Sequence, residues 1–477
     1  MDLPSNSNES ESNRPRSQRG SRRNGGVPNR RAFLRAAGAT AAAFGGFALG
    51  NPAVATDEYD AVVDIVADYG ADDTGTEPIN DALDAAVDDN TKVIFPDGEY
   101  WIDGAGYHNW DVSNLALVGE GNASLRPTAD SNPVLLVLHG DRIRVENFTI
   151  DQTATDTSTG INVVADDGLV LRNLHFDGAG DGPGGPTDSY GDNGERHGPF
   201  NIVPGVTDPQ GTGLIENVHM PDGTIPYYRK GGMWVANEHA GHLLIRRCSF
   251  EEFSDNAIYA SGAGVPGRGE DGSVGVENCF FRNNTVSAIR LGTPGSYAEN
   301  CTVVMDEYGS PVLPWGGSAS RAAWLWYDFD GYLKNIDVIS NHPTGHGFYY
   351  HWSQNRKTSV ENCRVRMDAD GTVGFNSGVP GEPITLRNVS VTGNAGTFNP
   401  VWFVEREFAL ENCCIHQTGA NRDGVRAVNA DGTIDNTLID VTGVPIIEAG
   451  DSDVTVTNPR EKGGCAPAQR YHPMEQS

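Results

Sequence analysis

Lysine and net positive charge are the clearest shortages in this sequence. The 477 residues include 34 lysines and arginines against 64 aspartates and glutamates, which gives a formal net charge of −30. Only five of the 34 basic residues are lysines. A surface this acidic repels the phosphates of nucleic acids and of anionic membranes, so we expect no nucleic acid among its partners.

Cysteine is also scarce, and the seven cysteines have a spacing that matches no zinc motif. Five of them directly follow a repeated polar position described below, and should form a row of small apolar side chains in the interior: Cys248, Cys279, Cys301, Cys363 and Cys413. Cys279 and Cys301 fall in consecutive repeats, which makes a disulfide between them one possibility. The odd total leaves at least one thiol unpaired.

The chain contains one short apolar run, residues 36–50, which is rich in glycine and too short for a membrane anchor. It follows Arg30 and Arg31 and ends just before Ala53-Val54-Ala55, a cleavage pattern of small residues. This arrangement resembles a twin-arginine export signal. We therefore predict that residues 1–55 are a disordered segment plus signal peptide, and that the mature protein is a secreted, soluble monomer.

The sequence is rich in a short motif in which a polar residue and an asparagine lie inside a β-branched apolar stretch. Its key position recurs at intervals of 22 to 44 residues, and the longer intervals carry insertions rich in glycine and proline. The key residues are Asn147, Asn173, Asn217, Arg247, Asn278, Asn300, Asn335, Asn362, Asn388, Asn412 and Asn436. Short alternating segments of this kind are typical of strands rather than helices.

The shortest interval suits one turn of a solenoid with three short strands and three bends. Stacked turns would place the asparagines about 4.8 Å apart in a ladder. Asparagine tolerates the left-handed conformation of a tight bend, and its amide can bond to the asparagine above and below. We expect this ladder to be buried, with Arg247 as a missing rung. The repeat predicts an all-β fold, a parallel β-helix of about 11–13 turns over residues 56–455.

The start of the mature chain supports this fold independently. Residues 68–75 read DYGADDTG, a helix-like stretch covers residues 78–87, and residues 92–100 read KVIFPDGEY. This resembles the opening of the pectate-lyase-like superfamily, although residues 76–78 (TEP) stand where that family has a second aspartate. The resemblance extends over roughly residues 60–450. It implies a right-handed β-helix with a short N-terminal capping helix, followed here by a polar tail.

We place that tail at residues 456–477. The acidic, lysine-poor composition and the export signal together resemble a haloarchaeal, twin-arginine-exported member of the superfamily. In such proteins carboxylates hold water and cations in concentrated salt, which also screens their repulsion. An ordinary acidic extracellular protein is the alternative.

In this superfamily, sugars usually bind along the strand that follows the third bend of each turn. Strand alternation predicts that five side chains of these strands face outward: Trp234, Tyr259, Arg290, Trp326 and Tyr349. Aromatic rings stack on sugars and arginine binds carboxylates, so we interpret the column, with Lys230 nearby, as a site for an acidic polysaccharide. The alternative is that several of these rings belong to the core.

Two catalytic arrangements are possible on this column. A lyase needs a base for the proton next to a uronate carboxylate and a cation for the carboxylate, for which Arg290 and His351 are candidates. A glycoside hydrolase needs two carboxylates. Asp328 and Asp330, with His346 between two glycines, weakly resemble the polygalacturonase pattern, although Asp328 to Gly331 would also suit a simple turn.

The sequence predicts no cofactor with certainty. Calcium is the one candidate, because the insertion at residues 178–213 carries Asp181, Asp188 and Asp192, although they match no known loop motif. The chain is therefore expected to be an enzyme, a lyase or hydrolase acting on a uronate-containing polysaccharide, or a non-catalytic carbohydrate-binding or surface protein on the same scaffold. A convergent acid–base pair would favour the enzyme, and rings without such a pair would favour the binder.

Overall fold

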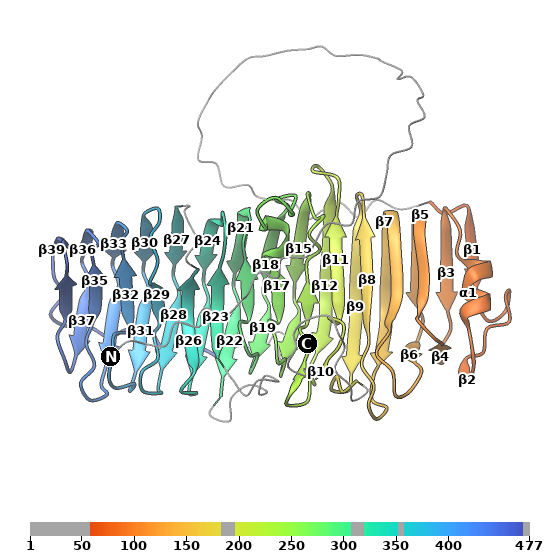
Figure 1. Ribbon diagram of the computed structural model, residues 1–477, viewed down its shortest axis with the longest axis horizontal. Helices are drawn as coiled ribbons and strands as arrows, with labels where there is room; N and C mark the ends of the chain where they lie inside the picture. Colours follow the sequence, from red (N-terminus) through yellow and green to blue (C-terminus); the bar gives the residue numbers. More distant parts are fainter. Residues whose placement is uncertain (1–57, 183–195, 307–318, 352–356, 471–477) are drawn as a thin grey trace, which may run out of the picture. The chain divides into compact units, whose positions relative to one another are not determined.

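The computed structural model describes residues 58–182, 196–306, 319–351 and 357–470, and the predicted export signal lies outside these ranges. The chain is an all-β parallel solenoid of about 14 turns with very little helix. Strands β1 (Ala61–Asp64) and β39 (Val454–Thr457) lie at its two ends, and each strand pairs with the equivalent strand of the next turn (Figure 1). The prediction of 11–13 turns was too low, because the first turns have no copy of the asparagine motif.

Each turn contributes to three parallel sheets. The first sheet precedes the asparagine ladder and runs from β1 to β39, where Asp435 of the preceding turn pairs in register with Thr457. Its remaining members are β3 (Thr91–Phe95), β5 (Tyr107–Gly119), β7 (Val134–Asp151), β9 (Leu169–Asp177), β12 (Thr212–Met220), β15 (His242–Arg246), β18 (Ser273–Glu277), β21 (Pro294–Glu299), β24 (Asp330–Lys334), β27 (Thr358–Glu361), β30 (Ile384–Arg387), β33 (Phe408–Glu411) and β36 (Gly432–Asp435).

The second sheet follows the ladder, and the long strands β7, β9 and β12 bend through the corner to enter it. Its other strands are β2 (Thr74–Pro78), β4 (Glu99–Ile102), β6 (Ser124–Pro127), β16 (Ser249–Glu251), β19 (Phe280–Arg282), β22 (Thr302–Met305), β25 (Asp337–Ser340), β28 (Arg364–Met367), β31 (Ser390–Gly393), β34 (Cys414–Gln417) and β37 (Leu438–Val441).

The third sheet follows the last bend of each turn and begins with the first halves of β5 and β7. It continues with β8 (Gly160–Ala165), β11 (Ile202–Val206), β14 (Met233–Trp234), β17 (Ile258–Ala260), β20 (Ile289–Leu291), β23 (Ser320–Leu325), β26 (Gly345–Tyr350), β29 (Phe375–Ser377), β32 (Val401–Val404), β35 (Val425–Val428) and β38 (Ile446–Ala449). Strands β10 (Arg196–His197) and β13 (Tyr228–Arg229) pair separately, and Gly262–Gly264 form a short 3-10 helix.

The asparagine ladder is present but is not buried as predicted. Its residues have φ between 44° and 65°, and Asn173 donates its amide N–H to the Asn147 side chain at 2.8 Å. The same bond joins Asn335 to Asn300 at 2.9 Å. Most of these side chains, including Asn147, are exposed, because the bend places the ladder residue at the outer corner. The residue that follows each asparagine turns inward instead.

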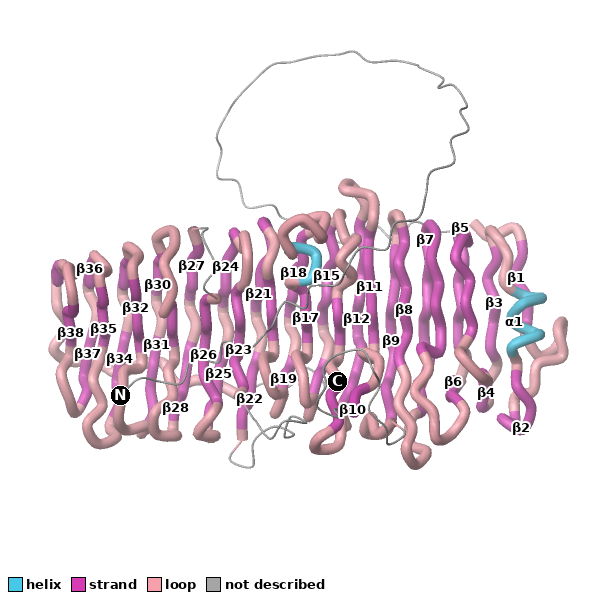
Figure 2. Tube along the Cα trace, in the orientation of Figure 1, coloured by secondary structure: helices cyan, strands magenta, loops and turns pink. Residues whose placement is uncertain are grey.

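The N-terminal end carries the expected helix, α1 (Asn80–Ala86), which is shorter than the predicted 78–87 (Figure 2). Its apolar side Ala82, Leu83 and Ala86 is buried against the first turns. A solenoid end exposes unpaired backbone and apolar side chains, and the helix covers them here. No helix within the described ranges is long and apolar enough to cross a membrane.

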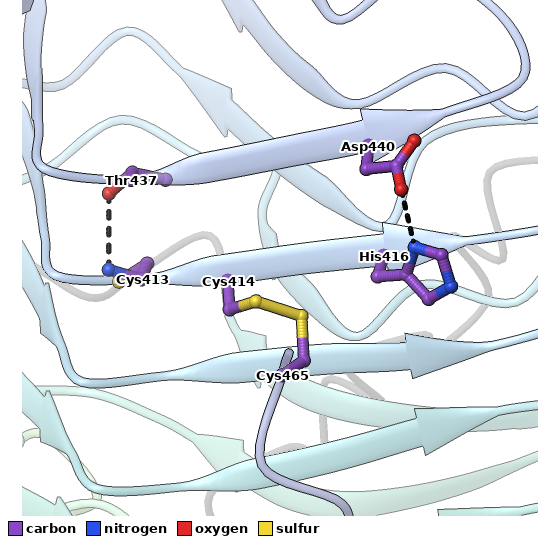
Figure 3. Close-up of a disulfide and its surroundings, with 6 residues drawn as sticks. All are labelled: Cys413, Cys414, His416, Thr437, Asp440 and Cys465. Atoms are coloured by element: carbon purple, nitrogen blue, oxygen red, sulfur yellow. Dashed lines mark hydrogen bonds and ion pairs between the residues drawn. A yellow bond between two sulfur atoms is a disulfide. The ribbon is translucent and has the colours of Figure 1, made fainter. Parts of the chain in front are cut away.

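The possible disulfide between Cys279 and Cys301 does not form. Both are buried free thiols, and each Sγ donates to the backbone carbonyl two residues before it at 3.3 Å. The disulfide instead joins Cys414 on β34 to Cys465, with the Cα atoms 5.4 Å apart (Figure 3). It forms because the C-terminal segment returns along the second sheet, where the backbone N–H of Gln469 reaches Asp337 on β25 at 3.0 Å.

Candidate functional site

The third sheet carries one outward column through successive turns. The aligned residues are Trp234, Tyr259, Arg290, Trp324, Tyr349, Asn376, Trp402 and Arg426. The sequence assigned Trp326 to this column, whereas Trp324 is the residue in register with Arg290 and Tyr349. Alternation puts Trp324 and Trp326 on the same side, and the sequence offered no means to choose between them.

Arg290 lies at the centre of the rings. Its Cζ is 3.7 Å from the centre of the Trp326 ring and 4.1 Å from that of Tyr259. The Trp324 ring centre is 5.1 Å away, and the Arg290 Nε donates to Ser261 Oγ at 2.8 Å. A guanidinium at these distances from aromatic faces is held by cation–π attraction, which fixes its position. Tyr259 and Arg290, both predicted to face outward from the sequence, are therefore in direct contact.

Trp326 follows β23 directly and is almost completely buried. The imidazole of His351, one turn further, stacks on it with ring centres 3.3 Å apart and an interplanar angle of 11°. The indole Nε1 of Trp326 is buried and has no acceptor among the described residues. Because β23 lies between β20 and β26, Trp326 separates Arg290 from His351 while contacting both.

Arg321 is a second guanidinium at this site, and the sequence analysis missed it. Its Cζ is 4.3 Å from the centre of the Trp324 ring and 5.2 Å from that of Tyr349. Its Nη1 donates to the Val286 carbonyl at 3.1 Å, and its buried Nε has no acceptor among the described residues. No spacing rule pointed to Arg321, because it lies at the start of β23, outside the alternating column.

The local electrostatic environment is positive, in contrast to the net charge of −30. Burial lowers the pKa of Arg321, and the charge of Arg290 lowers it further. Burial likewise lowers the pKa of His351 to about 3, with additional effects from Arg290 and Arg321. His346 also has its pKa lowered to about 3 by burial and by Arg321. Both imidazoles are therefore neutral at ordinary pH.

The predicted carboxylate pair lies at a bend. Asp328 and Asp330 are exposed and follow the C-terminal end of β23, at the bend that leads into the first sheet. His346 is in register with Arg321, near the opposite end of the same strands. Its Nδ1 accepts a hydrogen bond from the Val373 N–H at 3.3 Å. The structure therefore does not bring His346 together with the two aspartates.

Lys230, predicted beside the column, is buried. Its ammonium donates to Gln152 Oε1 at 2.8 Å, to Ser158 Oγ at 2.9 Å and to the Thr159 carbonyl at 2.6 Å. Burial lowers its pKa well below the usual value. Three protein oxygens satisfy its three donors, so Lys230 contacts the neighbouring turns and does not face the outer column.

The N-terminal part of the column also includes a ring from the long insertion. Phe200 lies 6.2 Å from Trp234 and 6.5 Å from Tyr259, measured between ring centres. Of the acids considered for calcium, Asp188 and Asp192 lie outside the described residues. Within the described ranges, no group of three or more His, Cys, Asp or Glu side chains is arranged to hold a metal ion.

No protein-family model matches the chain. No curated protein matches it significantly in sequence. Among solved structures it is similar to the Streptococcus pneumoniae surface protein and adhesin PfbA, at 11% identity and a TM-score of 0.49, with 83% of this chain and 100% of that one covered. It is also similar to the mannuronan C-5 epimerase AlgE4 A-module of Azotobacter vinelandii, at 12% identity, a TM-score of 0.36 and coverages of 83% and 100%.

A third similar structure is the family 28 exopolygalacturonase of Yersinia enterocolitica, at 12% identity and a TM-score of 0.36, with 85% of this chain and 79% of that one covered. These proteins include an adhesin and enzymes of different chemistry. Similarity at this level does not indicate which activity, if any, this chain has.

Proposed function

We propose that the outer face of the third sheet from β14 to β26 binds an acidic polysaccharide through its carboxylates. The observation that supports this is that two guanidiniums face the same Trp324 ring, with the Cζ of Arg290 5.1 Å and that of Arg321 4.3 Å from its centre. Two neighbouring guanidiniums repel each other, and a bound anion between them would relieve that repulsion. Arginine pairs well with carboxylates, and the surrounding rings offer faces on which sugars stack.

The chemistry that best suits this arrangement is β-elimination, which would make the protein a polysaccharide lyase. A guanidinium would hold the uronate carboxylate, and a base would remove the proton at C5. The electron pair would form the C4–C5 double bond, and the C4–O bond would break. The departing oxygen would take up a proton and become a new reducing end. We assign His351 as the base because its imidazole is neutral and lies near both guanidiniums, and a bound uronate carboxylate would raise its pKa from about 3 towards the range of a working base.

The same electrostatics are less suitable for a glycoside hydrolase, which needs two carboxylates across the scissile bond. The charges that shift the pKa values of His346 and His351 are all arginines. Asp328 and Asp330 are exposed at the next bend. The alternative function is a non-catalytic carbohydrate-binding or surface protein, which would use the same rings and cations without the base.

We place this activity outside the cell, by twin-arginine export in a haloarchaeal setting. The signal-like residues 29–55 support this proposal, as does the Cys414–Cys465 disulfide, because such bonds persist in oxidising compartments. The large excess of acidic residues supports a salty medium. We further propose that the protein acts as a monomer.

The decisive experiment incubates the purified protein with polygalacturonate, alginate and hyaluronate over a range of salt concentrations. Absorbance of the unsaturated product, new reducing ends and equilibrium binding are all recorded. We expect binding to at least one polymer, with the double bond and the reducing ends rising together. Arg290→Gln should weaken binding at least about tenfold, since a charge-assisted hydrogen bond contributes about 1.5–3 kcal/mol.

The matched control is Arg364→Gln. Arg364 is on β28 in the second sheet, where it pairs with Asp337, so this variant removes one positive charge away from the proposed face. Its binding should equal that of the unaltered protein. Binding without either product would favour the non-catalytic alternative, and no binding to any polymer would contradict the proposal.

A further inference from the structure

The outward column continues beyond the proposed site to a second pair of a ring and a cation. Trp402 on β32 and Arg426 on β35 are in register on adjacent turns, with the Arg426 Cζ 5.9 Å from the centre of the Trp402 ring. Phe398 packs edge-on against Trp402, with ring centres 5.3 Å apart. The pair thus repeats, on a smaller scale, the arrangement of Arg290 among its rings.

Several N–H donors of this second pair have no partner. The buried Nε of Arg426 and the buried Nε1 of Trp402 have no acceptor among the described residues. The Nδ2 of Asn399, three residues before Trp402, also has no acceptor among the described residues, and the Asn399 side chain is 2% exposed. Buried donors are normally satisfied within the protein, so three donors without a protein acceptor in the described ranges leave this part of the third sheet able to bind acceptors of a ligand.

The second feature of this pair is the positive charge of Arg426. Within the described part of the chain no carboxylate forms an ion pair with it, although the sequence has 64 acids for 34 bases. On the first sheet, by contrast, Arg387 pairs with Glu411 at 2.8 Å and with Glu361 at 3.5 Å. In a protein with such an excess of carboxylates, an arginine that faces rings instead of acids is available to an external anion.

We propose that Trp402 and Arg426 form a second carbohydrate subsite, which takes a uronate unit of the same polymer that lies over Arg290. This inference rests on the proposed function and adds the direction of the bound chain. Five turns separate β20 from β35, which at about 4.8 Å for each turn places the two arginines about 24 Å apart. The polysaccharide runs along the solenoid axis, and only a ligand of several sugars contacts both subsites.

The test measures the affinity of a uronate trisaccharide and of the long polymer of the same sugar. Linked contacts make the second binding event intramolecular, so the polymer gains from the second subsite and the trisaccharide does not. Arg426→Gln and Trp402→Ala should each lower the ratio of polymer to trisaccharide affinity by about tenfold. Arg426→Lys should restore part of this ratio, because it keeps the charge but loses the planar fork.

Arg387→Gln serves as the charge-matched control, since it removes one positive charge from the first sheet, and its ratio should equal that of the unaltered protein. Thermal unfolding of each variant confirms that it folds. An unchanged ratio in Arg426→Gln and Trp402→Ala, while Arg290→Gln still weakens binding, would overturn the second subsite alone. Absence of binding in the unaltered protein would overturn the proposed function, and this inference with it.

Discussion

Charged side chains at the corner after the first sheet form ion pairs with one another, whereas those on the outer face of the third sheet contact aromatic rings. Just before the asparagine ladder, acids and bases of successive turns stack in register: Glu146, Arg172, Glu216, Arg246, Glu277, Glu299, Lys334, Glu361, Arg387, Glu411 and Asp435. Most of the bases here lie between acids, as Arg246 does at 2.7 Å from Glu216. On the third sheet, Arg290, Arg321 and Arg426 face aromatic rings instead.

This difference distinguishes the charges that stabilise the solenoid from the charges that can bind a ligand. Charges that are satisfied within the protein contribute to the stability of the solenoid and present little to a ligand. Cation–π contacts hold a guanidinium in position and add no negative charge, so an anion still gains by binding at such a site. Substitutions at the ladder corner should therefore change stability and spare binding, and substitutions on the third sheet should do the reverse.

The largest effect is expected at Glu216. Its nearly buried carboxylate accepts hydrogen bonds from Arg246 at 2.7 Å and from Arg247, and its other oxygen lies 3.2 Å from the Arg172 Nε in an ion pair. Glu216→Gln leaves three guanidiniums without their shared anion, and should cost about 3 kcal/mol of folding free energy. The melting temperature and the midpoint of chemical unfolding measure this loss, and polysaccharide binding of the folded variant should be unchanged.

The control within the same column is Glu411→Gln. The Glu411 side chain is 38% exposed and pairs with Arg387, so its loss should cost less than about 1 kcal/mol. Equal destabilisation by Glu411→Gln and Glu216→Gln would contradict the larger stabilising effect that we assign to Glu216 and its three arginines.

A smaller effect is expected at the ladder itself. Asn335 has φ of 53° and donates to Asn300 at 2.9 Å. Asn335→Ala combines left-handed strain with a lost hydrogen bond, for about 2 kcal/mol in total. Asn335→Gly removes the bond but adopts the conformation without strain, so it should destabilise less. Chemical unfolding of both variants measures the difference, and equal losses would show that the left-handed conformation is unimportant.

On the third sheet, Trp234→Ala should weaken polysaccharide binding about threefold to tenfold, since a stacked ring contributes about 0.5–1.5 kcal/mol. Its melting temperature should stay close to that of the unaltered protein, because the ring lies on the outer face. Trp101→Ala, on the second sheet, removes a ring of the same kind away from the column and should leave binding unchanged. A large loss of stability in Trp234→Ala would show that this ring stabilises the fold and is not dedicated to ligand binding.

The last prediction concerns the pH dependence of stability. The pKa of His346 is about 3 in the folded protein and about 6.5 in an unfolded chain. As the pH falls from about 6.5 towards 3, the unfolded state gains a proton that the folded state does not bind, so stability is lost. His346→Gln removes this contribution, and its melting temperature should fall less steeply than that of the unaltered protein between these pH values.

The comparison of the two pH profiles cancels the titration of the many carboxylates, which both proteins share. Parallel profiles would mean that the imidazole titrates normally in the folded protein. His416, which is on β34 of the second sheet and pairs with Asp440, is a suitable control position for the same substitution (Figure 3).

The fold could be predicted because its determinants are local and repeated. An asparagine in the left-handed region ends the first-sheet strand in turn after turn, and the residue after it turns inward. The error over ladder burial has the same origin, since periodicity shows that a residue is repeated but not which side of the bend it occupies. A further left-handed asparagine, Asn458, follows β39 as Asn436 follows β36, and it lies inside the predicted tail.

The candidate site could be predicted only in part, because it depends on contacts between turns. Loops of different length precede each third-sheet strand, so the alignment of Trp324 with Arg290 required the pairing of β20 with β23. Lys230 was misjudged because the oxygens that hold it come from residues more than 70 positions earlier in the chain. Arg321 was missed because its rings are contributed by its own and the following strand.

The sequence by itself determined the repeating turn, the all-β class, the capping helix and the existence of an outward column with Arg290 and Tyr259. These follow from backbone preferences and from strand alternation, which act within a few residues. Only the tertiary structure decided which rings surround which cation, which cysteines pair and which basic residues are buried. Such contacts join residues of different turns, and their distances depend on the stacking of the whole solenoid.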